Sequence, residues 1–376
     1  MKTKSKVKKA TVRSREFIAA LKKAQWVIDR KSESPFDLTE VHFGKVSKIR
    51  ATNKNQEIVI PFSADVERGF TILLDPRAIF TKLSGHDRPV DVSLDGANVV
   101  ISDDVITFRT TTFDVDGPDL VEFRQGTTND QFSISEAELH KALSAVKFAT
   151  ASEQGRTYLN GIFMTQHNGK MAVVATNGQV LCEYTLDKMH SGQSIVIPKG
   201  AISTLLRLIS PKSADLLQIS IYGPTPERDC NAKIPQNICI KHKNWAFKSN
   251  ADGSGQGYPD YNKVIPKPSD NIRISALKES INRIPNEYSS VIFSPENGTA
   301  VAFSARRLAA RDDKIEFTID GHGESFQLSV PYLKKILAAL GDFAISGSGR
   351  REPFLVMQCA EDSRIRCVLM PICFPR

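Results

Sequence analysis

The chain lacks the long apolar runs that a membrane span requires. A helix that crosses a bilayer needs about 20 consecutive apolar residues, and no stretch of this sequence approaches that length. The first nine residues, MKTKSKVKK, are basic, but no apolar core follows them, so we predict no signal peptide. We therefore expect a cytoplasmic protein that makes no contact with a membrane.

The motifs of the common enzyme classes are also missing. There is no GxxxxGKS/T loop for a nucleotide, and residues 321–325 read GHGES where a nucleophile elbow needs GxSxG. Two pairs of adjacent acids, residues 103–104 and 312–313, fall at expected turns and are interpreted as solvated loops. Because no acids, histidines and nucleophiles cluster in the sequence, we predict a protein without catalytic activity, metal or cofactor.

Cysteine spacing gives no sign of a zinc site or a disulfide framework. None of the six cysteines forms a CxxC pair, and no histidine follows at zinc-finger spacing. We predict reduced thiols in strands. These cysteines are Cys182, Cys230, Cys239, Cys359, Cys367 and Cys373.

Size and charge set the broad class. At 376 residues the chain exceeds the ~250–300 residues at which a single core stops growing, so two or three domains are expected. The formal net charge is +8, and five of the positive charges fall in the first nine residues, at Lys2, Lys4, Lys6, Lys8 and Lys9. This basic tail, residues 1–9, either improves solubility or contacts anionic phosphates.

One sequence unit occurs three times. Each copy has an apolar stretch ending in Ser and an amphipathic helix, then a second apolar stretch, a Pro and another amphipathic helix. The Ser residues are Ser14, Ser135 and Ser275, and Pro76, Pro198 and Pro331 follow them by 62, 63 and 56 residues. The unit is too long for a solenoid repeat of roughly 20–50 residues. Three small domains of one kind are therefore expected.

The six expected helices share one pattern, an apolar stripe with basic residues displaced from it. In the first helix the stripe is Phe17, Leu21, Ala24 and Ile28. The displaced bases of the six helices are Lys22, Lys23, Arg77, Lys82, Lys141, Lys147, Lys199, Arg207, Lys278, Arg283, Lys334 and Lys335. Each base alone is typical of a solvated surface, but the recurrence in six helices favours a shared basic face.

The segments between the helices alternate apolar and polar residues, as strands do, and Asp95-Gly96 and Asn177-Gly178 predict tight hairpin turns. Two helices per copy are too few to cover both faces of six to eight strands. We therefore predict an α+β fold with two helices on one face of antiparallel sheets in each domain. The polar stretch 126–130 and the Pro- and Gly-rich segment 253–270 mark the boundaries.

Five segments together resemble the bacterial DNA polymerase III β subunit, the sliding clamp. They are YLNGIFM at 158–164, VATNGQVL at 174–181, VIPKGAISTLLRLI at 196–209, YPDYNKVIPK at 258–267 and VLMP at 368–371. The resemblance implies three similar domains, at 1–127, 128–266 and 267–376. It also implies a non-catalytic head-to-tail dimer whose ring encircles duplex DNA and tethers the replicative polymerase.

Inside such a ring, basic residues would meet phosphates without reading the bases. The resemblance implies DNA contacts at Arg30 or Lys31, Arg77, Gln154, Arg156, Thr157 and Tyr158, in addition to the displaced helix bases.

Clamps also dock short linear peptides from polymerases, the clamp loader and repair factors, in a pocket between the second and third domains. The positions that match this pocket are Leu159, Thr176, Gly178, Gln179, Val180, Leu181, Pro259, Lys263, Val264, Val368, Met370, Pro371 and Ile372. The sequence departs from the family at residues 179–181, which read Gln-Val-Leu in place of His-Arg-Leu, and after Pro371. The alternative interpretation of each position is a strand-core residue.

The resemblance places a dimer seam between the first domain of one protomer and the third domain of the other. Our candidates are Phe108 on a first-domain strand, and Ile281 and Ile284 on a helix that Pro285 should end early. Two alternatives stay open at this point. One is an open, monomeric, non-specific nucleic-acid-binding module, and the other is a divergent or accessory clamp with non-replicative partners.

Overall fold

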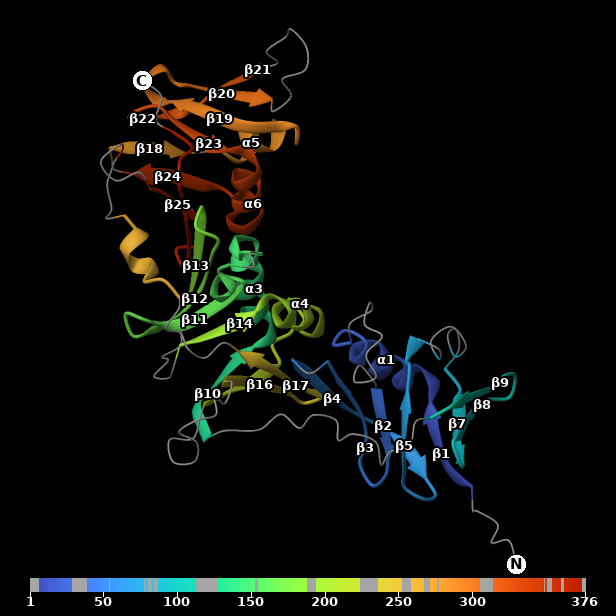
Figure 1. Ribbon diagram of the computed structural model, residues 1–376. Coiled ribbons are helices and arrows are strands. Elements are labelled where there is room, and N and C mark those ends of the chain that lie inside the picture. The colour runs from blue at the N-terminus through green and yellow to red at the C-terminus, as the bar shows by residue number, and fades with distance from the viewer. Residues whose placement is uncertain are drawn as a thin grey trace, which may run out of the picture. The chain divides into compact units, whose positions relative to one another are not determined.

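Figure 1 presents the protein as a computed structural model. The structure describes residues 7–28, 39–53, 55–77, 79, 83, 87–112, 127–152, 155–187, 194–223, 236–251, 258–266, 271–275, 277–304, 314–347, 349, 354–359 and 362–373.

Contacts divide the chain into two compact units, and each unit combines segments that are far apart in the sequence. The first unit is Met1–Ala137 with Ser203–Ala251, and the second is Glu138–Ile202 with Asp252–Arg376. Each unit holds two sheets, and every strand pairing in the described part of the chain is antiparallel.

The first unit contains a five-stranded and an eight-stranded sheet. In spatial order the smaller sheet is β5 (Ala64–Val66), β1 (Lys8–Arg13), β7 (Pro89–Asp95), β8 (Asn98–Ser102) and β9 (Thr107–Thr111). The larger sheet is β10 (Thr127–Ser135), β15 (Leu216–Gly223), β16 (Gln236–His242), β17 (Trp245–Ala251), β4 (Gln56–Phe62), β3 (Ser47–Thr52), β2 (Thr39–Phe43) and β6 (Phe70–Leu74).

The second unit contains a nine-stranded and a four-stranded sheet. The nine-stranded sheet is β14 (Ile195–Pro198), β11 (Gly161–His167), β12 (Lys170–Thr176), β13 (Val180–Leu186), β26 (Ile365–Leu369), β25 (Leu355–Cys359), β24 (Phe343–Gly347), β18 (Ile272–Ser275) and β22 (Asp320–His322). The four-stranded sheet is β21 (Lys314–Thr318), β20 (Thr299–Ser304), β19 (Tyr288–Ser294) and β23 (Phe326–Ser329).

Among the described residues, the helices are short and fewer than the strands. The α-helices are α1 (Ser14–Ala24), α3 (Glu136–Val146), α4 (Lys199–Leu208), α5 (Lys278–Arg283) and α6 (Val330–Leu340). Single 3-10 turns are η1 (Lys147–Ala149), η2 (Thr157–Leu159), η3 (Tyr261–Val264) and η4 (Pro295–Asn297). Within the described ranges, no helix has the length and apolar character needed to cross a bilayer.

The predicted apolar stripes are the buried faces of the helices. In the first unit, α1 packs on β3 and β4, and its Phe17 lies against Phe43 and Phe62 with ring centroids 6.4 and 5.4 Å away. In the second unit, α6 buries Leu333, Ile336, Leu337 and Leu340. The stripe of an amphipathic helix therefore became core, as the 3.6-residue period predicts.

Two details of the sequence interpretation need correction. The first helix ends at Ala24, so Ile28 lies beyond it, and Val27 is the buried residue after the helix. Lys8 and Lys9 are not part of a tail, because both belong to β1, where the Lys9 ammonium lies 2.9 Å from a carboxylate oxygen of Asp91.

Other predictions are confirmed or lie beyond the described residues. The Asp95-Gly96 and Asn177-Gly178 turns join β7 to β8 and β12 to β13, with φ of +57° at Gly96 and +87° at Gly178. Most of the helix predicted after Pro76 lies outside the described residues. The three-domain division stays a prediction, and the eight- and nine-stranded sheets each combine strands from two of the predicted domains.

Candidate functional site

The turn between β12 and β13 is fixed by its own side chains. The Thr176 hydroxyl donates to the Val180 carbonyl at 2.9 Å, and the Asn177 carboxamide oxygen accepts the Gln179 and Val180 N–H groups, both at 3.0 Å. Such local side-chain-to-backbone bonds are why Thr and Asn favour turns. Gly178 supplies the left-handed backbone conformation that the turn requires.

A tyrosine on α6 braces the same turn. The Tyr332 hydroxyl donates to the Gln179 side-chain oxygen at 2.7 Å and accepts from the Asn177 side-chain amide at 2.9 Å. Residue 179 is a point of departure from the family pattern, and its side chain here serves a contact within the unit. The turn at residues 177–179 is thus held by hydrogen bonds to α6 that the sequence pattern alone does not reveal.

The strands after this turn bring distant segments of the chain together. β13 pairs with β26, and Leu181 lies opposite Val368 in that register. The Met370 N–H donates to the Gln179 carbonyl at 3.0 Å, which extends the pairing past the end of β26. The VATNGQVL and VLMP segments are therefore neighbours in space.

These segments line an apolar cavity of about 300 Å³ in the second unit. Its lining residues are Arg156, Tyr158, Leu159, Thr176, Gly178, Gln179, Val180, Leu181, Pro259, Asp260, Tyr261, Val264, Phe354, Val368 and Met370. We call this cavity the apolar pocket. Leu159, Leu181 and Val368 are buried in a single hydrophobic cluster, so the floor of the pocket is part of the core.

Two tyrosines of the YPDYNKV segment belong to the same cluster, and Tyr261 also lines the pocket. Tyr258 stacks on Phe163, with ring centroids 4.3 Å apart, and its hydroxyl donates to the Val174 carbonyl at 3.5 Å. Tyr261 donates to a carboxylate oxygen of Glu183 at 3.4 Å. Burial raises the pKa of both phenols above the usual value, so both stay protonated donors at neutral pH.

Ten of the thirteen positions predicted for a peptide pocket line this one cavity. The three that do not are Lys263, Pro371 and Ile372. The Lys263 side chain is exposed beside Asp260. After Pro371 the chain turns to β23, where the Ile372 N–H donates to the Gln327 carbonyl at 2.8 Å. These three residues do not line the cavity, and their role in peptide docking stays a prediction.

Sequence reasoning missed Asp260, Tyr261 and Phe354 as lining residues and assigned Arg156 and Tyr158 to DNA rather than to the pocket. Tyr261 stands inside a recognised segment, so the signal was present. Phe354 precedes β25 and is brought in through the pairing of β25 with β26. That pairing leaves no local mark in the sequence.

The predicted DNA-binding bases lie on exposed parts of each unit, and several have partners in their own chain. In the first unit, Lys22 and Lys23 occupy the last turn of α1, opposite its buried face, and Arg77 pairs with Asp75 at 3.0 Å. Arg207 is exposed in the last turn of α4. Arg30, Lys31, Lys82 and Gln154 lie outside the described residues.

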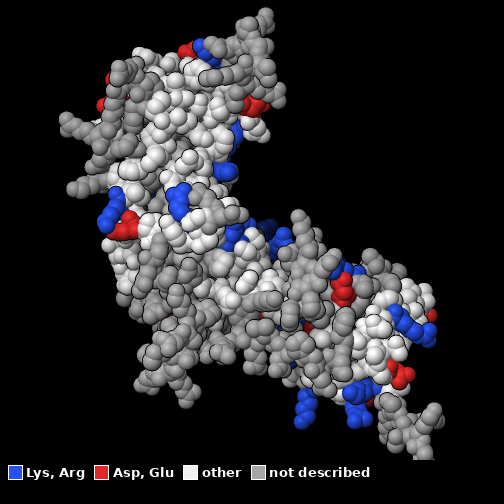
Figure 2. All heavy atoms as spheres, viewed as in Figure 1, with Lys and Arg blue, Asp and Glu red and all other residues white. Residues whose placement is uncertain are grey.

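In the second unit, Figure 2 shows basic side chains along the edge formed by α6 and α3. Lys141 of α3 lies 2.6 Å from Asp362, Lys334 of α6 donates to Asn286 at 2.7 Å, and Lys199 donates to Ser152. Arg283 pairs with Glu279 one turn away. The Lys335 ammonium lies 5.6 Å from the centre of the Tyr332 ring. The remaining predicted residues, Lys147, Thr157 and Lys278, are half-buried or exposed.

The candidates for the dimer seam differ in exposure. Phe108 is half-buried on β9, which is an end strand of the five-stranded sheet. Ile281 and Ile284 are 0% and 1% exposed, which leaves their side chains no surface for a direct contact with a second chain. The seam prediction therefore rests on Phe108 and its strand.

One cluster in the described part of the first unit has side chains of the metal-ligating type, namely Glu136, Asp215 and His242. The His242 Nδ1 accepts the Asn244 N–H at 3.2 Å, so a neutral ring carries its proton on Nε2. That nitrogen faces Asp215 and Glu136 at 3.5 and 3.9 Å. A protonated Nε2 cannot ligate a metal, and the geometry favours a histidine–carboxylate contact.

Known proteins resemble this chain in regions that form part of the apolar pocket. Residues 133–260 match the family model of the DNA polymerase III beta subunit, central domain. The beta sliding clamp of Pseudomonas aeruginosa is 24% identical over 272 residues, which are 68% of this chain and 68% of that protein. The beta sliding clamp of Escherichia coli K12 is 23% identical over 264 residues, 67% of each chain.

Solved structures extend the likeness over almost the whole chain. A Pseudomonas aeruginosa sliding clamp bound to griselimycin aligns with a TM-score of 0.81 and 18% identity, covering 98% of this chain and 100% of that chain. A Bartonella birtlesii clamp bound to griselimycin gives 0.83 and 18%, with the same coverage. The fold is therefore the α+β DNA-clamp fold, as predicted.

The fold and the sequence matches point to the same group of proteins. The α+β DNA-clamp fold is shared with these solved sliding-clamp structures over 98% of the chain. The chain is a divergent homologue of the bacterial β sliding clamps. The proteins that match are sliding clamps, a family of non-catalytic processivity factors, which agrees with the sequence prediction.

Proposed function

We propose that the protein is a sliding clamp that encircles duplex DNA without reading its sequence and docks partner proteins through short linear peptides. The apolar pocket is the observation that carries this proposal, because ten positions selected for peptide docking line one cavity. DNA polymerases, a clamp loader and repair factors are the partners that the family suggests.

The size and chemistry of the pocket suit a peptide anchor. A cavity of about 300 Å³ lined mainly by Leu, Val, Pro and aromatic side chains accepts one or two large apolar side chains. Met370 is 44% exposed at its rim, and its flexible thioether adapts to anchors of different shape. Apolar anchors in small pockets dominate the affinity of peptide interfaces.

For DNA, the proposal relies on topology more than on contact strength. Phosphate contacts alone give a Kd of only about 10⁻⁴–10⁻⁶ M at physiological salt, so a closed ring has to provide retention. A head-to-tail dimer would close such a ring. The position of β9 at the end of a sheet supports this proposal, because end strands readily pair with a second chain. A cytoplasmic location is part of the same proposal.

The peptide proposal is tested with a matched pair of variants. Met370→Ala removes a lining side chain that is 44% exposed, whereas Ile372→Ala removes an apolar side chain that is 56% exposed and does not line the pocket. We expect Met370→Ala to weaken binding of a fluorescent peptide with two large apolar residues about tenfold, or roughly 1.4 kcal/mol, and Ile372→Ala to leave it unchanged. Equal affinity of both variants and the parent protein would contradict the proposal.

The ring proposal is tested by DNA topology. After long incubation with nicked circular DNA, the protein is moved to 0.5 M salt and separated on a sizing column before and after a single cut. We expect co-elution with the circle and loss from the linear product. Equal retention on both forms would instead favour the open nucleic-acid-binding module, and sedimentation as a monomer at micromolar concentration would exclude a stable dimer ring.

A further inference from the structure

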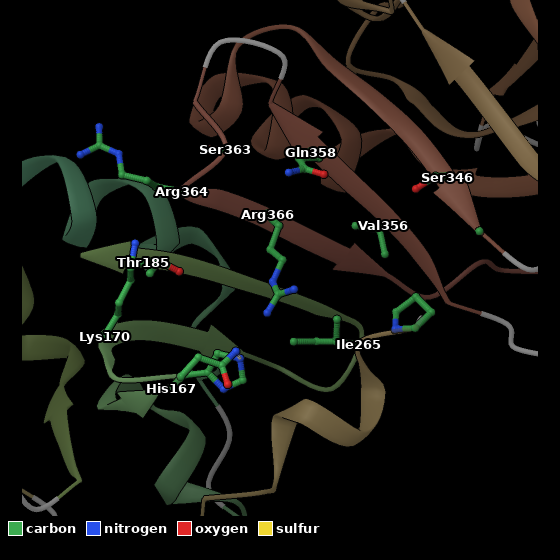
Figure 3. A pocket seen from close by; sticks show the side chains of 13 residues that line it. His167, Lys170, Thr185, Ile265, Ser346, Val356, Gln358, Ser363, Arg364 and Arg366 are labelled. Atoms are coloured by element: carbon green, nitrogen blue, oxygen red, sulfur yellow. Dashed lines mark hydrogen bonds between the residues drawn. The ribbon is translucent and has the colours of Figure 1, made fainter. Parts of the chain in front are cut away.

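A second cavity of about 400 Å³ lies in the same unit, and its chemistry is different. Arg364, Arg366, Lys170 and His167 line it, together with Gln358 and Val356, and none of the described residues that line it carries a carboxylate. We call it the basic cavity. Figure 3 shows the Arg366 side chain reaching into the space between β26 and residues His167 and Ile265, with Lys170 and Arg364 at the edge.

The acidic partners of these bases lie behind them or at the rim. The Arg366 Nε donates to Glu183, whose side chain is 0% exposed. Arg364 donates to both carboxylate oxygens of Asp362, at 2.9 Å each. Lys170 lies 2.7 Å from a carboxylate oxygen of Asp187. Each of these three cations thus has a carboxylate partner, but the cations line the cavity and the carboxylates do not.

Strand register shows that the basic cavity is the neighbour of the apolar pocket. In one row across β13, β26 and β25 lie Leu181, Val368 and Val356, and in the next row on the same face lie Glu183, Arg366 and Gln358. Two residues along a strand separate these rows, or about 7 Å. The chain at the end of η3 also connects the cavities, because Val264 lines the apolar pocket and the next residue, Ile265, lines the basic cavity.

We propose that the basic cavity binds acidic residues that flank the apolar anchor of a peptide docked in the apolar pocket. This inference rests on the proposed peptide docking and names the class of partner, a linear segment with an apolar anchor and adjoining Asp or Glu residues. From Met370 to Arg366 is four residues of strand, about 13 Å. An extended peptide covers that distance with about four residues, so the acidic residues lie within four positions of the anchor.

The walls of the basic cavity favour a peptide over a bare phosphate chain. Ile265, Pro266 and Val356 give it apolar sides next to the cationic groups. Such a mixed lining suits carboxylate side chains, whose methylene groups contact apolar walls while the charge meets a guanidinium. Charge complementarity at an exposed site also raises the association rate.

The test compares peptides that share one apolar anchor and carry four added residues at the N- or C-terminal side, either all Glu or all Ser. Binding is measured by fluorescence anisotropy at 50 mM and 500 mM salt. We expect the Glu extension at one end to tighten binding about fivefold to tenfold over the Ser extension at low salt, and the gain to disappear at high salt.

The variant combines Glu183→Gln with Arg366→Gln, which removes the central cation without leaving a buried charge unpaired. It should bind the Ser peptide as the parent does and lose most of the gain from Glu. Lys170→Gln should lose part of it. Lys314→Gln, an exposed lysine outside both cavities, is the matched control and should retain the full gain. Thermal unfolding checks that each variant is folded.

The outcomes separate the two proposals. If the Ser peptide fails to bind the parent protein, the proposed function falls and takes this inference with it. If it binds but Glu brings no gain at either end, or the gain survives in the double variant, only the inference is overturned. Competition by a short single-stranded oligonucleotide that depends on Arg366 would reassign the cavity to nucleic acid and would also overturn it.

Discussion

The apolar pocket and the basic cavity lie on the same face of one sheet and use the same strands, yet they present opposite chemistry. The transition from Leu181 and Val368 to Glu183 and Arg366 takes a single step of two residues along β13 and β26. The backbone hydrogen bonds do not change across that step. Successive side chains on one face of a strand pair can thus form an apolar pocket and a charged cavity side by side, while the backbone structure stays the same.

The two sites also differ in what holds them together. The floor of the apolar pocket is hydrophobic core, so folding itself forms it. The centre of the basic cavity depends on an ion pair between Arg366 and a fully buried Glu183. Substitution of a residue of this ion pair should therefore lower the free energy of unfolding more than the partial exposure of Arg366 suggests.

The largest effect is expected for Arg366→Ala. Removal of the guanidinium leaves the Glu183 carboxylate buried and without its cation, which costs roughly 3 kcal/mol of unfolding free energy. Adding Glu183→Gln should recover most of that loss, because the unpaired charge is gone. Urea unfolding measures both. A loss under 0.5 kcal/mol for the single variant would show that the pair does not stabilise this face.

Asp362→Asn should follow, with a loss of about 1–3 kcal/mol at pH 7. Hydrogen bonds from Arg364, and then from Lys141, hold the pKa of Asp362 below its usual range. A carboxylate with a lowered folded-state pKa stabilises the fold above its unfolded pKa of about 3.9 and loses that effect as pH falls through the folded value. The difference between the parent and the variant should therefore shrink below about pH 4. A difference that stays constant with pH would contradict this cause.

Gly178→Ala tests the mouth of the apolar pocket. The φ of +87° disfavours any side chain, and an added methyl carbon would lie 3.3 Å from the Arg156 Nη1. We expect a loss of about 1–2 kcal/mol in thermal or urea unfolding. Gly96→Ala is the matched control, since its φ is +57° and no atom lies within 4 Å of the added carbon. Only Gly178→Ala should also change peptide affinity.

The smallest effect on stability is expected for Lys170→Gln. The Lys170–Asp187 pair spans 2.7 Å, but its side chains are 54% and 61% exposed. Exposed ion pairs contribute about 0–1 kcal/mol, so the urea midpoint should move little. A large shift would mean that the exposed Lys170–Asp187 pair stabilises the fold as the buried Arg366–Glu183 pair does, so that the two pairs would not differ in their contribution to stability.

Most of the apolar pocket could be predicted because its residues sit in segments that resemble a known family and because strand pairing unites those segments. The C-terminal end could not, since Ile372 follows a recognised segment but turns to β23 through a bond with Gln327. That contact joins residues 45 positions apart and has no periodic signature. The helix stripes were predictable because burial obeys the helical period.

The sequence analysis did not predict the basic cavity, although part of its pattern can be recognised in the sequence. Arg366, Val368 and Met370 stand at every second position, so alternation alone places them on one face. What the sequence hides is that Glu183 lies opposite Arg366, which requires the register of two distant strands. The seam candidates Ile281, in α5, and Ile284, just after it, are both buried within their own chain, which the helical pattern alone does not distinguish from a contact with a second chain.

Met370 stands between two anchored points of the backbone. Its own N–H is bonded to Gln179, and two residues later the Ile372 N–H is bonded to Gln327. With the main chain clamped on both sides, only three side-chain torsions are left to respond to an incoming ligand. The Met370 side chain can then adapt to ligands of different shape, and little backbone conformational entropy is lost when a ligand binds. A docking site shared by several partners in turn would need this property.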